Sequence, residues 1–328
     1  MRIKTVLLLV ALLVTSSLSL SVTANEHIRV ASFNIAEFGE GSHPDTRDIP
    51  YIAELLTAND LDLIAIQELG VRDEADVQLN ALVSAMNQQI LSGEPHYFSF
   101  STTKTGDERY AVIYRAPVVL NDDILWLDDD KDPNNAGSGG ETFFRVPVAI
   151  PFHAGDFDFY VVIMHLAWGD LDRRTNEVKA IKTFLDTKDP TEDDWIVLGD
   201  MNRYGKYNKG TPNKAFDQLL VGNWSSRYRF PLLEAVTEPD DMTIYRASID
   251  EHSTTIAAKN NMYDQIIITE GLFAEFGTTT PIMGQDIDII AFDRDARFTV
   301  LDHNAIKYQV SDHRPVWIRL QIDLGDDD

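Results

Sequence analysis

Ser311-Asp312-His313-Arg314-Pro315-Val316 says most about the fold, because it places a carboxylate and an imidazole side by side in a short polar segment. The run 306–310 precedes it and the apolar run 316–318 follows it, and we expect both to be strands. An Asp beside a His in a loop between strands suits a metal ligand next to a proton carrier. A match to Ser-Asp-His alone arises often by chance, so its meaning depends on the rest of the chain.

Several other short apolar runs are typical of buried strands. They cover residues 27–33, 63–66, 111–114, 157–164, 195–198, 265–269 and 316–322. Helical patterns lie between them: 49–58 follows Asp48 as a capping residue, 76–91 is amphipathic, and 175–185 carries an apolar stripe. This alternation, with hairpin-like pairs of strands, predicts a mixed α/β sandwich with two central sheets.

Polar residues stand at the ends of these runs, where a common sheet edge would collect them. They are Asn34, Glu68, Asp200, Asn202, Asp264, Asp312 and His313. Four or more carboxylates at one edge would repel each other unless a hard cation lay among them, and oxygen ligands suit magnesium, manganese or calcium. Asn34 or Asp200 alone is also typical of a turn or helix cap. Glu68 is harder to explain in that way, because an unpaired carboxylate after a buried run is costly.

Together these motifs resemble the endonuclease/exonuclease/phosphatase superfamily. The matching segments are Ser32-Phe33-Asn34, Gln67-Glu68, His165, Gly199-Asp200-Met201-Asn202, Tyr263-Asp264 and the segment 311–316, in the family's order. The resemblance implies a four-layer α/β/β/α sandwich with two central mixed β-sheets. It also implies cleavage of phosphoester bonds by water, assisted by Mg²⁺ or Mn²⁺.

The segment 107–115 resembles the deoxyribonuclease I branch of that family. There, a glutamate placed like Glu108 orients a histidine like His165, and an aspartate like Asp264 orients one like His313. Each acid would hold the tautomer of its histidine, so that one histidine accepts the proton of water and the other protonates the leaving oxygen. Lipid and inositol phosphoesterases also place a histidine at the His165 position. A lipid or sugar phosphoesterase, such as a sphingomyelinase-like enzyme, and a catalytically silent binding module therefore remain alternatives.

The remaining roles follow from the same resemblance. Asn34, Glu68 and Asp312 are expected to hold the metal, and Asp200 and Asn202 to position water, phosphate or a second ion. Arg145 stands where the deoxyribonuclease-like branch keeps an arginine that contacts phosphate, and Arg72 is a second candidate for that contact. Alternatively, Arg145 forms a surface salt bridge, because the chain is rich in acidic residues.

An acidic loop at 128–141 superficially matches a calcium loop between Asp130 and Glu141, but its flanks read as strands rather than as the helices of an EF-hand. The deoxyribonuclease-like branch holds a structural Ca²⁺ in this region, which would place Asp129 and Glu141 beside the ion. The alternative is a disordered acidic loop.

Residues 1–24 are expected to be a signal peptide, with a basic start at Arg2 and Lys4, an apolar stretch at 6–14 and small residues before Asn25. A membrane anchor is the alternative, but the apolar stretch is short and serines interrupt it. We therefore expect a secreted or periplasmic protein with no stable membrane insertion after cleavage. Residues 25–322 would form the endonuclease/exonuclease/phosphatase-like domain, and 323–328 an acidic tail. The chain has no Cys, so no disulfide stabilises it.

The formal net charge of −25 normally argues against a nucleic-acid partner, whose phosphates attract Lys and Arg. Most of the acidic side chains are expected on the surface, where they promote solubility, and a bound divalent cation reverses the field locally. The sequence as a whole therefore predicts a monomeric, secreted, metal-dependent phosphodiesterase. We expect an endonuclease that hydrolyses DNA, with RNA as a second substrate.

Overall fold

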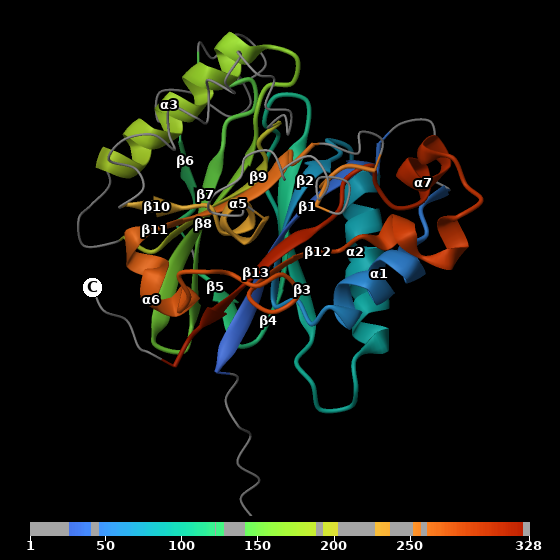
Figure 1. Cartoon of the computed structure of the whole chain (residues 1–328). Coiled ribbons are helices and arrows are strands. Elements are labelled where there is room, and N and C mark those ends of the chain that lie inside the picture. The colour runs from blue at the N-terminus through green and yellow to red at the C-terminus, as the bar shows by residue number, and fades with distance from the viewer. Residues whose placement is uncertain are drawn as a thin grey trace, which may run out of the picture.

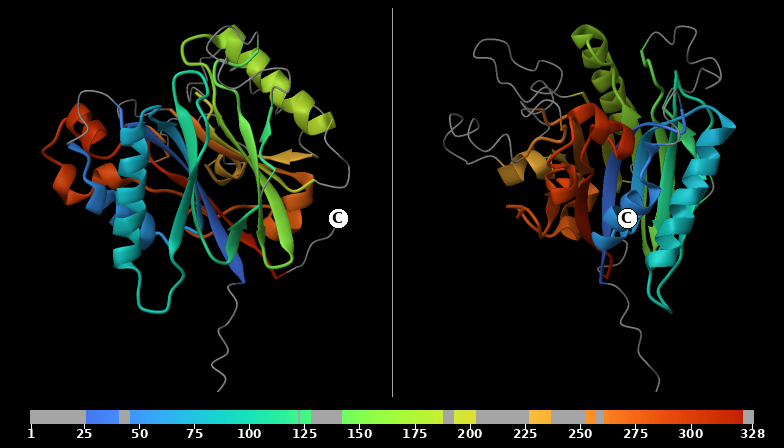
Figure 2. Two further views of the ribbon diagram at one scale, coloured as in Figure 1. Left: turned by 180° about the vertical axis from the view of Figure 1, so that it is seen from behind. Right: turned by 90° about the vertical axis from the view of Figure 1, so that its right-hand side faces the viewer.

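The computed structural model describes residues 26–40, 46–121, 123–127, 142–187, 193–202, 227–236, 252–256 and 261–323. Two β-sheets pack face to face, and helices cover their outer faces (Figures 1 and 2). This arrangement is the predicted four-layer α/β/β/α sandwich. The expected signal peptide, the calcium loop at 128–141 and all of the acidic tail except Asp323 lie outside the described residues.

The first sheet has six strands in the order β12-β13-β1-β2-β4-β3. Their bounds are β12 (Ile287–Ile289), β13 (Val316–Gln321), β1 (His27–Phe38), β2 (Leu63–Leu69), β4 (Arg109–Arg115) and β3 (Tyr97–Ser101). β1 and β2 run parallel, and the other neighbours are antiparallel. The sheet is therefore mixed, with its parallel pair near the middle.

The second sheet has seven strands in the order β10-β11-β9-β8-β7-β5, with β6 also paired to β7. Their bounds are β10 (Tyr228–Arg229), β11 (Asp264–Thr269), β9 (Trp195–Asp200), β8 (Phe157–His165), β7 (Val148–Ala154), β5 (Val118–Leu120) and β6 (Leu125–Trp126). β8 and β9 are the parallel pair here. Each sheet thus brings the carboxyl ends of two adjacent strands to the same edge.

Alternation along the strands decides which side chains lie between the sheets. In β1, Ile28 and Val30 join the core that contains the second sheet, whereas Ala31 and Phe33 join the core under the helices of the first. Successive side chains of a strand point to opposite faces, so Asn34 shares the inter-sheet face with Ile28 and Val30. The same alternation directs His165 of β8 into the space between the sheets.

Helices cover both outer faces. α1 (Ile49–Ala58) and α2 (Asp73–Gln89) pack on the first sheet, and α3 (Leu171–Thr187) lies on the second (Figure 1). The Asp48 carboxylate accepts a hydrogen bond from the N–H of Tyr51 at 3.1 Å, which confirms the predicted cap. Among the described residues, the shorter helices include α5 (Pro231–Val236), α6 (Phe273–Phe276), α7 (His303–Gln309) and the 3₁₀ turns Glu270–Leu272, Phe292–Arg294 and Ala296–Phe298.

The run 306–310 was expected to be a strand, and that prediction is wrong because most of it belongs to α7. Asp302 caps this helix by accepting a hydrogen bond from the N–H of Ala305 at 2.8 Å. Ile306 and Val310 stand four residues apart, so one helical face can bury both side chains, as the structure does. The Ser-Asp-His segment therefore lies between a helix and the strand β13.

Among the described residues, no helix has the length and apolar content needed to cross a membrane.

Candidate active site

Asn34 connects the two sheets at the edge where their parallel strands end. Its side-chain amide donates to Oε1 of Glu68 at 2.8 Å and to Oδ2 of Asp200 at 3.1 Å. Glu68 belongs to the first sheet and Asp200 to the second. One fully buried amide therefore holds carboxylates from both sheets in a common position.

The backbone around Glu68 leaves regular strand geometry. The pairing of β2 with β4 shifts between Ile66 and Leu69, and Glu68 has a φ of 61°. Ala36, Glu37 and Asn202 at the same edge also have positive φ. Such a conformation costs a non-glycine residue roughly 1–2 kcal/mol. The strain is thus concentrated where the polar side chains converge, as is common at functional sites.

β8 and β9 bring His165 and Asp200 into register as neighbours on parallel strands. Gly199 makes this approach feasible, because a Cβ at this position would collide with the carbonyl oxygen of Met164, and its φ is 139°. Asn202 donates its amide to the carbonyl of Leu166 at 2.8 Å, which ties the segment after β9 to the segment after β8. The two strand ends are therefore held together on both sides of Asp200.

Each histidine of the site is paired with one carboxylate. Nδ1 of His165 lies 2.9 Å from Oε2 of Glu108, and Nδ1 of His313 lies 2.8 Å from Oδ2 of Asp264. All four side chains are buried. Because each carboxylate engages Nδ1, the Nε2 atom of each ring is left to face the site.

Both Nε2 atoms converge on Asp200. Its Oδ2 lies 3.5 Å from Nε2 of His165 and 3.6 Å from Nε2 of His313. Its other oxygen, Oδ1, accepts a hydrogen bond from the N–H of Asn202 at 2.8 Å. Asp200 is therefore the central anion between two imidazoles, one at the end of β8 and one in the segment before β13.

The buried charges shift one another's pKa. Burial opposes protonation of His165, but the charges of Glu108 and Asp200 outweigh it and raise the pKa to about 9. His313 is likewise buried, yet Asp264 and Asp200 raise its pKa well above the ordinary value. Burial by itself would raise the pKa of Asp200, but the two imidazolium charges lower it. The neighbouring carboxylates therefore favour the protonated form of both rings.

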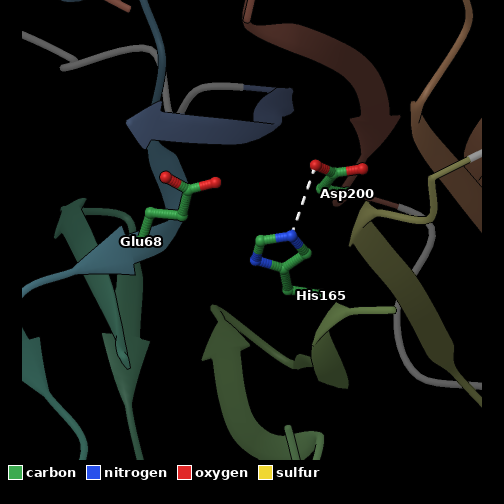
Figure 3. Close-up of side chains that lie close together, drawn as sticks. All are labelled: Glu68, His165 and Asp200. Carbon is green, nitrogen blue, oxygen red and sulfur yellow. Dashed lines mark ion pairs between the residues drawn. The ribbon is translucent and has the colours of Figure 1, made fainter. Parts of the chain in front are cut away.

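Glu68, His165 and Asp200 offer ligand atoms within 4.8 Å of one another. Figure 3 shows the Glu68 and Asp200 carboxyl groups on either side of the His165 ring, with an ion pair drawn between His165 and Asp200. Burial raises the pKa of Glu68, and the charge of Glu108 adds to that effect. Two carboxylates beside a carboxamide form a donor set that suits a hard divalent cation, which would relieve their repulsion.

Asp312, the other expected metal ligand, lies at the same edge but has a protein cation beside it. Nζ of Lys307 is 3.2 Å from Oδ2 of Asp312 and 3.4 Å from Oε1 of Glu37. The hydroxyl of Ser311 donates to the carbonyl of Asn34 at 2.7 Å, which joins the Ser-Asp-His segment to β1. Asp312 is thus held next to the Asn34 and Glu68 group while its carboxylate is paired with Lys307.

The two arginines predicted to contact substrate differ in their surroundings. Nε of Arg145 lies 2.8 Å from Oε2 of Glu108 and 2.9 Å from Oδ1 of Asp107, so this guanidinium belongs to the site. Arg72 is exposed at the start of α2, and its carbonyl accepts a hydrogen bond from Arg109 at 3.2 Å.

Two supporting cations were not anticipated from the sequence. Lys307 is one, and Arg47 is the other: its guanidinium donates to the carbonyls of Lys307 and Val310 at 3.1 and 2.7 Å and also to the carbonyl of Ala36. Arg47 thereby joins the turn after Asn34 to the end of α7. Lys307 and Val310 stand 260 and 263 positions away in the chain, and no local pattern signals such contacts.

Comparisons with known proteins agree with this geometry. A sequence model described as the Endonuclease/Exonuclease/phosphatase family matches residues 31–313. Human deoxyribonuclease-1 is 26% identical over 298 residues, which cover 90% of this chain and 92% of the human protein. The endonuclease/exonuclease/phosphatase from Bacteroides vulgatus aligns with a TM-score of 0.53 at 15% identity, covering 90% of this chain and 99% of that one.

A mannosyl-6-phosphatase of Bacteroides thetaiotaomicron aligns with a TM-score of 0.51 at 16% identity, covering 89% of this chain and 99% of that one. At such identities the two structural likenesses concern the fold alone. The family match and the deoxyribonuclease relatives support a phosphoester hydrolase. With nearly all of its described residues inside the matched range, the chain belongs to the endonuclease/exonuclease/phosphatase family.

Proposed function

We propose that this protein is a secreted, divalent-metal-dependent endonuclease that cleaves DNA, with RNA as a second substrate. The observation that carries the proposal is the pair of carboxylate–imidazole contacts, Glu108 with His165 and Asp264 with His313, directed at one point. The similarity to deoxyribonuclease-1 over 90% of the chain supports DNA as the substrate.

In this proposal the two histidines divide the proton transfers. A phosphodiester placed next to both Nε2 atoms would have one ring accept the proton of the attacking water and the other protonate the leaving oxygen. Glu108 and Asp264 keep the rings in position and stabilise their protonated forms. Arg145, held beside Glu108, would bind a non-bridging oxygen of the phosphate.

The metal is expected on the Asn34 side of the site. Glu68 and Asp312 would hold Mg²⁺ or Mn²⁺ with Asn34 in support, while Asp200 and Asn202 would orient water or phosphate. A bound divalent ion supplies positive charge that stabilises the negative charge developing on the phosphate oxygens. The Asn34 amide orients the Glu68 and Asp200 carboxylates through its two hydrogen bonds.

A lipid phosphoesterase would gain support from an aromatic hairpin that projects toward a membrane. The aromatic segment 224–230 is the candidate for such a hairpin. Tyr228 and Phe230 are buried, with 5% and 3% of their surface exposed, whereas Trp224 lies outside the described residues. The described part of the segment packs into the core, which favours the nuclease over the lipid enzyme.

The test is the purified protein with Mg²⁺ on supercoiled plasmid DNA, RNA, sphingomyelin and a generic phosphodiester. We expect nicking of the plasmid, and we expect His165→Ala to lower the rate by about 10²–10⁴ because one proton transfer loses its carrier. Lys179→Ala, an exposed position on α3, is the control. Hydrolysis of sphingomyelin without nicking at low salt would contradict the proposal.

A further inference from the structure

Two exposed aromatic side chains stand beside the candidate site. Trp168 follows His165 by three residues and has 71% of its surface exposed, and Phe144 precedes Arg145 and is 37% exposed. Single exposed aromatic residues are common on protein surfaces and need no special explanation. These two differ because each is joined by the chain to a residue of the site.

Buried charged residues hold the backbone of both segments. The carboxylate of Glu177 accepts from the N–H of Phe144 at 3.0 Å and from the N–H of Ala167 at 2.8 Å. Arg174 donates to the carbonyl of Ala167 at 2.9 Å. Glu177 and Arg174 are 0% and 1% exposed. Trp168 therefore projects into solvent from a backbone that is fixed next to it, which lowers the entropy cost of binding.

Cationic groups accompany these aromatic rings. Cζ of Arg145 lies 4.9 Å from the Phe144 ring centroid, and Cζ of Arg173 lies 5.3 Å from it. Arg145 also contacts Glu108, so this group extends directly from the His165 pair. In a chain of net charge −25, two guanidinium groups beside an aromatic ring favour an anionic ligand.

We propose that Trp168 and Phe144, with Arg173 beside Phe144, form a stacking site for an unpaired nucleotide next to the cleaved phosphate. This inference rests on the proposed nuclease function and adds a preference to it. Every nucleobase has a flat π face, and stacking on an aromatic side chain stabilises binding without regard to sequence. Bases inside a duplex do not present that face. The enzyme therefore prefers single-stranded or locally melted DNA.

The experiment measures fluorescence anisotropy of a labelled oligothymidylate whose phosphorothioate backbone resists cleavage, at fixed low salt. We expect Trp168→Ala to weaken binding of this single strand about tenfold and to leave binding of the same strand annealed to its complement unchanged. Trp168→Phe should restore most of the affinity, because it keeps an aromatic face. Phe98→Ala is the matched control: Phe98 is 59% exposed and pairs with Tyr114 at the end of β4 opposite Glu108.

Each outcome has a distinct meaning. If Trp168→Ala binds the single strand as tightly as wild type while plasmid nicking persists, the stacking site is refuted and the nuclease proposal stands. If wild type neither binds the oligonucleotide nor nicks plasmid, both proposals fail. If Trp168→Ala instead loses binding to vesicles of phosphatidylcholine and sphingomyelin, Trp168 contacts a lipid surface and the stacking site is refuted.

Discussion

Lys307 places its ammonium 3.2 Å from the carboxylate of Asp312, a residue proposed to hold the catalytic metal. The same ammonium lies 3.4 Å from Glu37, which donates its backbone N–H to Glu68. A fixed protein cation therefore stands beside the metal ligands and shares one of them. An incoming divalent ion has to be accommodated next to this positive charge.

Lys307→Met should consequently bind Mn²⁺ about tenfold more tightly than wild type, since repulsion between the ammonium and the ion is removed. Isothermal titration of the metal-free protein measures this without any turnover. Lys179→Met removes one positive charge at an exposed position of α3 and should leave the affinity unchanged. Weaker binding in Lys307→Met would instead mean that the ammonium positions the Asp312 carboxylate for the metal.

Glu108→Gln should lower kcat by about a hundredfold or more with a small effect on KM, because His165 loses the anion that orients its ring. The pH profile of kcat should also move, since the anionic partner raises the pKa of His165. Asp107→Asn provides the matched control: Asp107 also contacts Arg145, but its side chain is 62% exposed. Equal losses of kcat in Glu108→Gln and Asp107→Asn would show that activity depends on the Asp107–Glu108 loop rather than on the contact between Glu108 and His165.

The metal-free protein should lose stability as the pH rises from about 6.5 toward about 9. The sign follows from proton binding: the folded state keeps the His165 proton over this range while the unfolded state releases it, so rising pH favours unfolding. His313 acts in the same direction. Urea unfolding in EDTA across this range should therefore show a shallower pH dependence for His165→Asn than for wild type. If the free energy of unfolding depends on pH equally in His165→Asn and in wild type, His165 does not contribute to that dependence.

Ser311→Ala should lower the free energy of unfolding by about 2 kcal/mol, because it leaves buried backbone groups without a partner. The Ser311 hydroxyl donates to the carbonyl of Asn34 at 2.7 Å and accepts from the N–H of His313 at 2.9 Å. Ser101→Ala, which removes a more exposed hydrogen bond to Asp76, should cost less. Equal losses in urea unfolding would contradict a special role for Ser311.

Calcium should raise the melting temperature of the wild-type protein in saturating Mg²⁺, because binding to the folded state alone stabilises it. The resemblance to the deoxyribonuclease I branch assigns this ion to Asp129 and Glu141. Asp129→Ala should abolish the increase, whereas Asp156→Ala, in the exposed turn between β7 and β8, should preserve it. If calcium leaves the melting temperature of the wild-type protein unchanged, the proposed structural Ca²⁺ is refuted.

The strand and helix periodicity of the amino-acid sequence predicted a mixed α/β sandwich with two central sheets, because such periodicity is local. The resemblance to the deoxyribonuclease I branch, rather than periodicity, supplied the expected partners of the two histidines. The prediction failed for 306–310, where five residues with alternating polarity fit a strand or a helix end, and the Asp302 cap together with burial of Ile306 favoured α7.

Only the tertiary structure decided how these groups share charge. Three contacts depend on strands and helices that are far apart in the chain. Asn34 hydrogen-bonds to both Glu68 and Asp200, Asp200 faces both imidazoles, and Lys307 forms an ion pair with Asp312. The positive φ of Glu68 likewise arises from the shifted pairing of β2 and β4. Distances of a few ångströms determine electrostatic energies, and residue order alone does not specify those distances.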